Sequence, residues 1–168
     1  LPAEEWDERA RPVIDRTAKL YIGGKQARPD SGYSYSVLNA KGQSLGQAGL
    51  GNRKDIRNAV EAAGKASGWS SVNAHNRAQV MYYLAENMAA RRSELEQSLS
   101  RLGHAARVAS REVELSLQRL FFYAGQADKF DGRVHAARAR HVTLAMNEAF
   151  GVMGIVAPVE APLLSFIS

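Results

Sequence analysis

Apolar and polar positions alternate over residues 19–51, which is typical of β-strands. Tyr33, Tyr35 and Val37, for example, alternate with serines. Gly23-Gly24 and the sequence NAKG at 39–42 predict tight turns between these strands. We therefore expect a small antiparallel meander in this part of the chain.

The spacing of apolar residues becomes helical after Asn52, whose side chain can cap a helix. Asn73 offers a second cap to one long helix that Gly103 ends, and a third helix is expected over 105–130. The side chains predicted to face inward on the second and third helices are Val80, Leu84, Met88, Leu95, Leu99, Leu102, Val113, Leu117, Leu120, Phe121 and Ala124.

Strand character returns at 133–148, and residues 151–156 are then nearly all apolar. A continuous apolar run predicts a strand that is covered on both faces, as in a parallel sheet. Only a helix at 162–168 follows, whereas parallel neighbours need crossovers of a dozen residues or more. We expect this run to be the first strand of a doubly wound sheet whose other strands lie outside this sequence.

The chain has 168 residues, a length that suits one domain. It begins at Leu1 with a charged stretch, and residues 1–18 are expected to form an arm. This beginning favours a processed product or a piece of a longer chain. No apolar run approaches the ~18 residues of a membrane span, so no membrane is expected as a partner, and a cytoplasmic location is the default expectation.

The composition excludes some kinds of site and points to one basic patch. The sequence has no cysteine, which excludes disulfides, thiolate metal sites and a cysteine nucleophile within it. The formal net charge is +5, and its dense patch is RVHAARARH at 133–141. A solvated ribbon is the favoured interpretation of that patch. A nucleic-acid-binding module that uses Arg133, Arg138 and Arg140 is the lesser alternative.

No catalytic motif stands out from spacing alone. The pairs Glu94/Glu96 and Glu112/Glu114 are two residues apart on expected helices, so they predict solvated charges. The four histidines lack the spacing of a metal site, and none is expected.

The stretch APVEAP at 157–162 predicts a turn between a strand and a helix. Pro158 ends the expected strand, and Pro162 suits the first turn of a helix. Ligands of open α/β sheets bind at such strand ends, and Glu160 would lie there. The alternative, favoured from chemistry alone, is that Glu160 is an acid stabilised by the helix dipole.

Six stretches together resemble the N-terminal third of the aldehyde dehydrogenase superfamily. LYIGGKQ and the later VLNAKG resemble its opening strand and turn, and DIRNAVEAAGKASGW with RAQVMYYLA resembles its first two helices. YAGQADKFDG resembles the end of its third helix, and NEAFGVMGIVAPVEAPLL resembles its "E-P-x-G-V-x-x-x-I-x-P-W-N-F-P-L" motif.

The resemblance implies an α/β fold of the aldehyde dehydrogenase type, incomplete, with antiparallel strands, three helices, a β-ribbon and the first strand of a doubly wound sheet. It implies an N-terminal arm at 1–18, a partial cofactor-binding domain at 19–132 and 149–168, and an oligomerisation β-ribbon at 133–148. Its partners would be a second copy, in a dimer through the ribbon, or the remainder of a longer chain.

The family oxidises aldehydes to carboxylic acids with NAD or NADP, by means of a cysteine thiolate and a glutamate base. By position in the motif, Val156, Ala157, Pro158 and Val159 would line the nicotinamide end of the cofactor cleft. Glu160 occupies the place of an asparagine that helps bind the oxyanion, and Val159 that of a tryptophan. A carboxylate cannot donate that hydrogen bond, and losing one such donor typically costs ~10²–10³ in rate.

The substitutions at Val159 and Glu160 and the lack of cysteine are similar to those in the degenerate second repeat of tandem-domain aldehyde dehydrogenases. The first hypothesis is therefore a catalytically inactive structural segment. The resemblance implies NAD or NADP as the cofactor, with the alternative that this chain binds none. The alternative is the N-terminal part of an active NAD(P)-dependent aldehyde dehydrogenase, whose nucleophile lies outside these residues.

Overall fold

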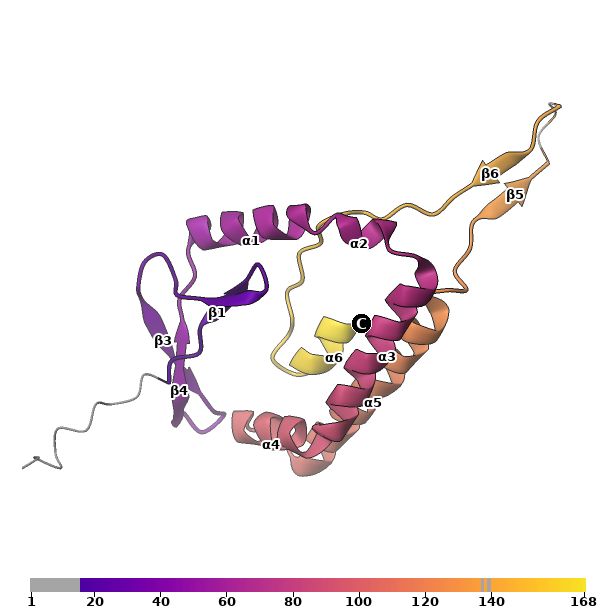
Figure 1. The fold of residues 1–168 in the computed structure, drawn as a ribbon. Coiled ribbons are helices and arrows are strands. Elements are labelled where there is room, and N and C mark those ends of the chain that lie inside the picture. Colours follow the sequence, from indigo (N-terminus) through magenta and orange to yellow (C-terminus); the bar gives the residue numbers. More distant parts are fainter. Residues whose placement is uncertain (1–15, 137, 139) are drawn as a thin grey trace, which may run out of the picture.

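The computed structural model describes residues 16–136, 138 and 140–168. Two hairpins and one helix lie at one end, a cluster of helices lies at the other, and a ribbon projects from that cluster (Figure 1). In chain order the elements are β1 (Leu20–Ile22), β2 (Lys25–Ala27), β3 (Ser34–Leu38), β4 (Ser44–Gly49), α1 (Arg53–Lys65), α2 (Gly68–Ser71), α3 (Ala74–Ala90), α4 (Arg92–Leu102), α5 (Ala106–Gln126), β5 (Arg133–His135), β6 (Thr143–Ala145) and α6 (Pro162–Ile167).

Strands β1 and β2 form one antiparallel hairpin and β3 and β4 form another. The predicted turn at Gly23-Gly24 is confirmed, and both glycines have positive φ, which other residues rarely adopt. The single meander is wrong, because β2 and β3 do not pair. Between them Pro29 has no N–H, and the N–H of Asp30 donates to the Asp55 carboxylate instead of to a strand (3.1 Å).

Most of the arm expected at 1–18 lies outside the described residues. Its last residue, Ala18, forms an isolated parallel bridge with Ala48 of β4.

Helix α1 begins where the sequence predicted. The Asn52 side chain accepts from Lys54 and Asp55, and the Asp55 side chain accepts from the Asn52 N–H, which completes a capping box. The box fixes the start of α1 beside the β3–β4 hairpin.

The predicted long second helix is broken. Arg91 leaves helical geometry at φ −101° and ψ 19°, so that α3 ends at Ala90 and α4 begins at Arg92. The break lets both helices contact α5, since Met88 before it and Leu95 after it pack against the same buried cluster. Gly103 ends α4 with φ 115°, as expected.

The core lies between α3, α4 and α5. The buried hydrophobic side chains of the described residues are Ala78, Ala85, Leu99, Ala109, Val113, Leu117, Leu120 and Ala124. The inward positions predicted on α5 are confirmed except Phe121, which is 37% exposed at the edge and lies against the Tyr82 ring. On α3 the prediction is wrong for Val80 and Leu84, each 51% exposed, because the small Ala78 and Ala85 face α5 instead.

Strands β5 and β6 pair antiparallel from Arg133↔Ala145 to His135↔Thr143, which confirms a ribbon within 133–148. The strand expected at 151–156 is not formed: these residues are exposed and belong to no ladder. A strand of a parallel sheet depends on neighbours for its hydrogen bonds, and the described residues supply none here. Within the described part of the chain, no helix has the length and apolarity to cross a membrane.

Candidate functional site

The candidate site residues Val156, Ala157, Pro158 and Val159 follow one another in an exposed segment. Figure 1 shows the chain from β6 to α6 as an extended connection that passes α2 and then turns into α6. Val156 is 98% exposed and Val159 82% exposed. The apolar side chains of this segment are therefore exposed, and most of them are not covered by other described residues.

Glu160 lies in the bend that ends this segment. With Val159 it lines an open hollow of about 320 Å³, whose other walls are Ala40, Leu102, Gly103 and His104. No hydrogen bond to its carboxylate occurs within the described residues, so the site has a free acceptor and no donor at this position. An ionised carboxylate accepts hydrogen bonds and has none to donate.

An acid other than Glu160 binds the first amides of α6. Glu112 of α5 accepts hydrogen bonds through Oε1 from the N–H groups of Leu163 (2.8 Å) and Leu164 (3.2 Å). Because Pro162 has no N–H, these are the first two amides of α6 that need an acceptor. Glu112 therefore caps α6 from a different part of the chain.

The prediction that Glu112 is a solvated charge is wrong, since its side chain is buried with 5% exposure. Its Oε2 and the hydroxyl of Ser116, one turn further along α5, are buried without a protein partner in the described residues. No sequence signal could have identified this site, because the amides that Glu112 binds lie 51 and 52 residues further along the chain.

The other three carboxylates of the two predicted pairs do lie at the surface. Glu94 pairs with Arg91 (2.7 Å), and Glu96 (2.8 Å) and Glu114 (3.2 Å) both pair with Arg92. The hydrogen bond from Arg92 lowers the pKa of Glu96 below its ordinary value, and Ser110 adds to the effect. The pair of Arg92 with Glu114 joins α4 to α5, and the other two pairs lie at the start of α4. Each of these three carboxylates thus has an arginine partner.

A second buried carboxylate, Asp55, anchors the other end of the molecule. It is 6% exposed and accepts from the N–H groups of Asp30 (3.1 and 3.2 Å) and Asn52 (2.9 Å). The spacing Asn52-x-x-Asp55 is a capping-box signature, so this anchor could have been found from the sequence.

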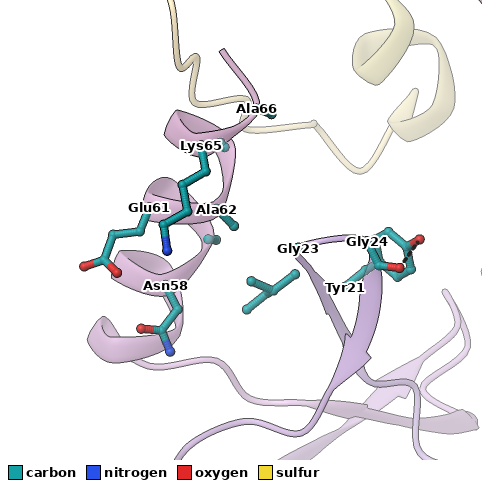
Figure 2. Close-up of a pocket in the computed structure, with 11 residues that line it drawn as sticks. Tyr21, Gly23, Gly24, Asn58, Glu61, Ala62, Lys65 and Ala66 are labelled. Atoms are coloured by element: carbon teal, nitrogen blue, oxygen red, sulfur yellow. Dashed lines mark hydrogen bonds between the residues drawn. The ribbon is translucent and has the colours of Figure 1, made fainter. Parts of the chain in front are cut away.

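Figure 2 shows an open groove of about 860 Å³ between the β1–β2 turn and α1. Tyr21, Gly23 and Gly24 form one side, and Asn58, Glu61 and Lys65 line the other. The Tyr21 hydroxyl donates to the Gly24 carbonyl across the turn (3.0 Å). Glu61 pairs with Arg57 (3.7 Å), so the groove brings together no set of side chains suited to catalysis.

The basic patch occupies the ribbon. Arg133 is in β5, and Arg138 and Arg140 are exposed in the bend before β6. Val134 and Leu144, which pair across the ribbon, are 73% and 58% exposed. Among the residues that the structure describes, no three histidine, aspartate or glutamate side chains gather as a metal site would require.

A dinucleotide does not fit the described residues alone. Val156, Ala157, Pro158 and Val159 are all exposed, and the polar side chains that line the hollow beside Val159 are those of Glu160 and His104. A cofactor would need further walls and polar groups from outside this chain.

Comparison with known proteins agrees with this incompleteness. The model of the family described as "Aldehyde dehydrogenase family" matches residues 16–168. The chain is 32% identical over 156 residues to the cytosolic 10-formyltetrahydrofolate dehydrogenase of Mus musculus, covering 87% of this chain and 17% of that protein.

Solved structures show the same relation. The NAD-dependent aldehyde dehydrogenase from Sinorhizobium meliloti superposes with a TM-score of 0.85 at 25% identity, over 99% of this chain and 34% of that one. PnpE in complex with nicotinamide adenine dinucleotide superposes with a TM-score of 0.70 at 27% identity, over 73% of this chain and 26% of that one. The predicted mixed α/β fold class is confirmed, the chain spans about a third or less of these proteins, and a homologous structure binds NAD.

Proposed function

We propose a function from the premise that this chain belongs to the aldehyde dehydrogenase family. These residues form a structural segment of an aldehyde dehydrogenase-fold protein, comprising part of a cofactor-binding domain and a ribbon, and do not themselves catalyse. The parent reaction is the NAD(P)-dependent oxidation of an aldehyde to a carboxylic acid.

The observation that carries this proposal is the carboxylate at position 160. The family places an asparagine amide at this point of the motif, where it donates to the oxyanion. Glu160 is exposed in the bend before α6, with a charge that would oppose a developing oxyanion.

The finer assignment is to the degenerate second repeat of a tandem-domain aldehyde dehydrogenase. Support comes from the replacement of both the tryptophan and the asparagine of the motif, by Val159 and Glu160. In such a protein the other repeat would provide the nucleophile and the cofactor, NAD or NADP. A cytoplasmic location is proposed because the mouse relative is a cytosolic enzyme by name.

The structural role would be exerted through the ribbon. Its exposed apolar side chains, Val134, Leu144 and Met146, are available to contact a second copy or the remainder of a longer chain. Binding of nucleic acid through Arg133, Arg138 and Arg140 is the lesser proposal, and retention on a phosphate matrix that depends on these arginines would support it.

The second candidate function is the N-terminal part of an active enzyme. The close superposition on the NAD-dependent enzyme from Sinorhizobium meliloti favours it, because the segment that would border the cofactor is retained. In that case Val156, Ala157, Pro158 and Val159 would line the nicotinamide.

The test compares wild type, Glu160→Asn and Glu160→Gln in the full natural polypeptide that carries these residues. Reduction of NAD and of NADP is followed with a panel of aldehydes. We expect the three rates to agree within about twofold, whether or not another part of the polypeptide is active. A rise of ~10²–10³ in Glu160→Asn would overturn the structural role in favour of the active enzyme.

A further inference from the structure

We propose that Glu112 is a positioning residue: its buried carboxylate fixes the N-terminus of α6 and thereby the place of the segment 156–160. The proposal concerns the folded chain and holds whether or not position 160 takes part in catalysis.

Helix α6 lacks the local features that would stabilise it. It has six residues, and Ala161 at its N-cap position makes no side-chain hydrogen bond. Helices this short are unstable alone, and their first N–H groups need acceptors. Glu112 supplies one ionisable acceptor to two of these amides, and hydrogen bonds to a charged group are about twice as strong as neutral ones.

The rest of α6 is held on the same face of α5. Leu163 packs against the cluster of Leu99, Ala109, Val113 and Leu117. At the far end the Tyr123 hydroxyl donates to the Ser168 carbonyl (3.3 Å), and the Arg119 guanidinium donates to the Ser168 hydroxyl. The first anchor of α6 thus lies early on α5 and the last lies late, so the two helices run in the same direction.

This docking decides where the candidate segment lies. Residues 151–160 are exposed, and no strand ladder holds them. Ala161 and Pro162 are half-buried and mark the point where the chain becomes tied to α5. Because Glu160 stands two residues before the start of α6, release of the α6 N-terminus would release the bend.

The test is amide hydrogen exchange in the full natural polypeptide, without substrate. Glu112→Gln keeps the size of the side chain but removes the charge. We expect exchange of the Leu163 and Leu164 amides to accelerate about three- to tenfold, with a smaller rise at Val159 and Glu160. Glu112→Asp keeps the charge on a shorter stem and should restore part of the protection. Amides in the middle of α5, such as that of Leu117, should be unchanged.

Glu114→Gln is the matched control, because Glu114 lies on the same helix and binds Arg92 and Gln118 at the surface. It should leave α6 unchanged. Equal protection of α6 in wild type and Glu112→Gln would overturn the proposal, as would an effect of Glu114→Gln of the same size. If Glu112→Gln does not fold, Glu112→Asp decides alone: exchange at Leu163 no faster than in wild type refutes the role. None of these readouts uses the rates at position 160, so the two proposals can fail separately.

Discussion

Different interactions stabilise the two ends of the molecule. In the helical half, α3, α4 and α5 contain every buried hydrophobic side chain of the described residues. In the half formed by β1–β4 and α1, the buried side chain within the described range is the carboxylate of Asp55. The first half is stabilised by apolar burial, and the second depends on hydrogen bonds that converge on one carboxylate.

The difference has consequences for how each half responds to change. Apolar burial is non-directional and contributes roughly 1.5–3 kcal/mol for a buried aliphatic side chain. The stability lost on truncation therefore increases with the size of the apolar group that is removed. A polar anchor is directional, and its removal leaves buried donors without a partner. We therefore expect core variants to lower global stability, and anchor variants to loosen one region selectively.

The largest effect is expected from Leu117→Ala, which truncates a side chain that is 8% exposed in the main cluster. Loss of the transfer energy, together with the cavity left behind, should lower the free energy of unfolding by about 2–4 kcal/mol. Urea denaturation measures it. Leu84→Ala is the control, since that side chain is 51% exposed and should cost less than about 0.5 kcal/mol. Equal effects would mean that α3 buries Leu84 after all.

A smaller effect is expected from Asp55→Ala, which leaves the N–H groups of Asp30 and Asn52 without their acceptor. The loss should be about 1.5–3 kcal/mol, the range for hydrogen bonds to charged groups. Exchange of the Asp30 and Asn52 amides should accelerate while that of α5 amides changes less. Asp55→Asn, which keeps the size of the side chain, should recover part of the loss. A uniform acceleration across α5 would contradict the contrast between the halves.

The smallest effect is expected from the partly exposed ion pair of Glu96 with Arg92. The hydrogen bond from Arg92 lowers the pKa of Glu96 in the folded protein, so the pair stabilises the fold above the unfolded pKa of Glu96. That contribution is lost as the pH falls through the folded pKa. The stability difference between wild type and Glu96→Gln should thus be small at neutral pH, shrink in acid and weaken at high salt. A difference that grows in acid would refute this assignment.

Local chemistry made several elements predictable from the sequence. Asn52 began α1, Gly23-Gly24 formed the first turn and Gly103 ended α4, because each acts through atoms within a few residues. The buried apolar positions Val113, Leu117, Leu120 and Ala124 of α5 followed from their spacing, since one face of a helix repeats every 3.6 residues. The family resemblance rested on ordered motifs of this kind, and the family model confirms it over residues 16–168.

The candidate site was predictable only in part. The sequence placed Val156–Glu160 in one segment before a helix, but whether that segment lines a cofactor stays a prediction. The break at Arg91 could not be foreseen, because the apolar stripe continues through it and only contact with α5 favours the bend.

The sequence by itself therefore determined the start of α1, the turn at Gly23-Gly24, the end of α4, the ribbon and the family. The turn and the two helix ends depend on neighbours along the chain. Tertiary structure alone decided that Glu112 is buried and that α6 is capped. Its carboxylate and the amides it binds are brought together by the packing of α6 on α5, across a separation of 51 residues that no local pattern spans.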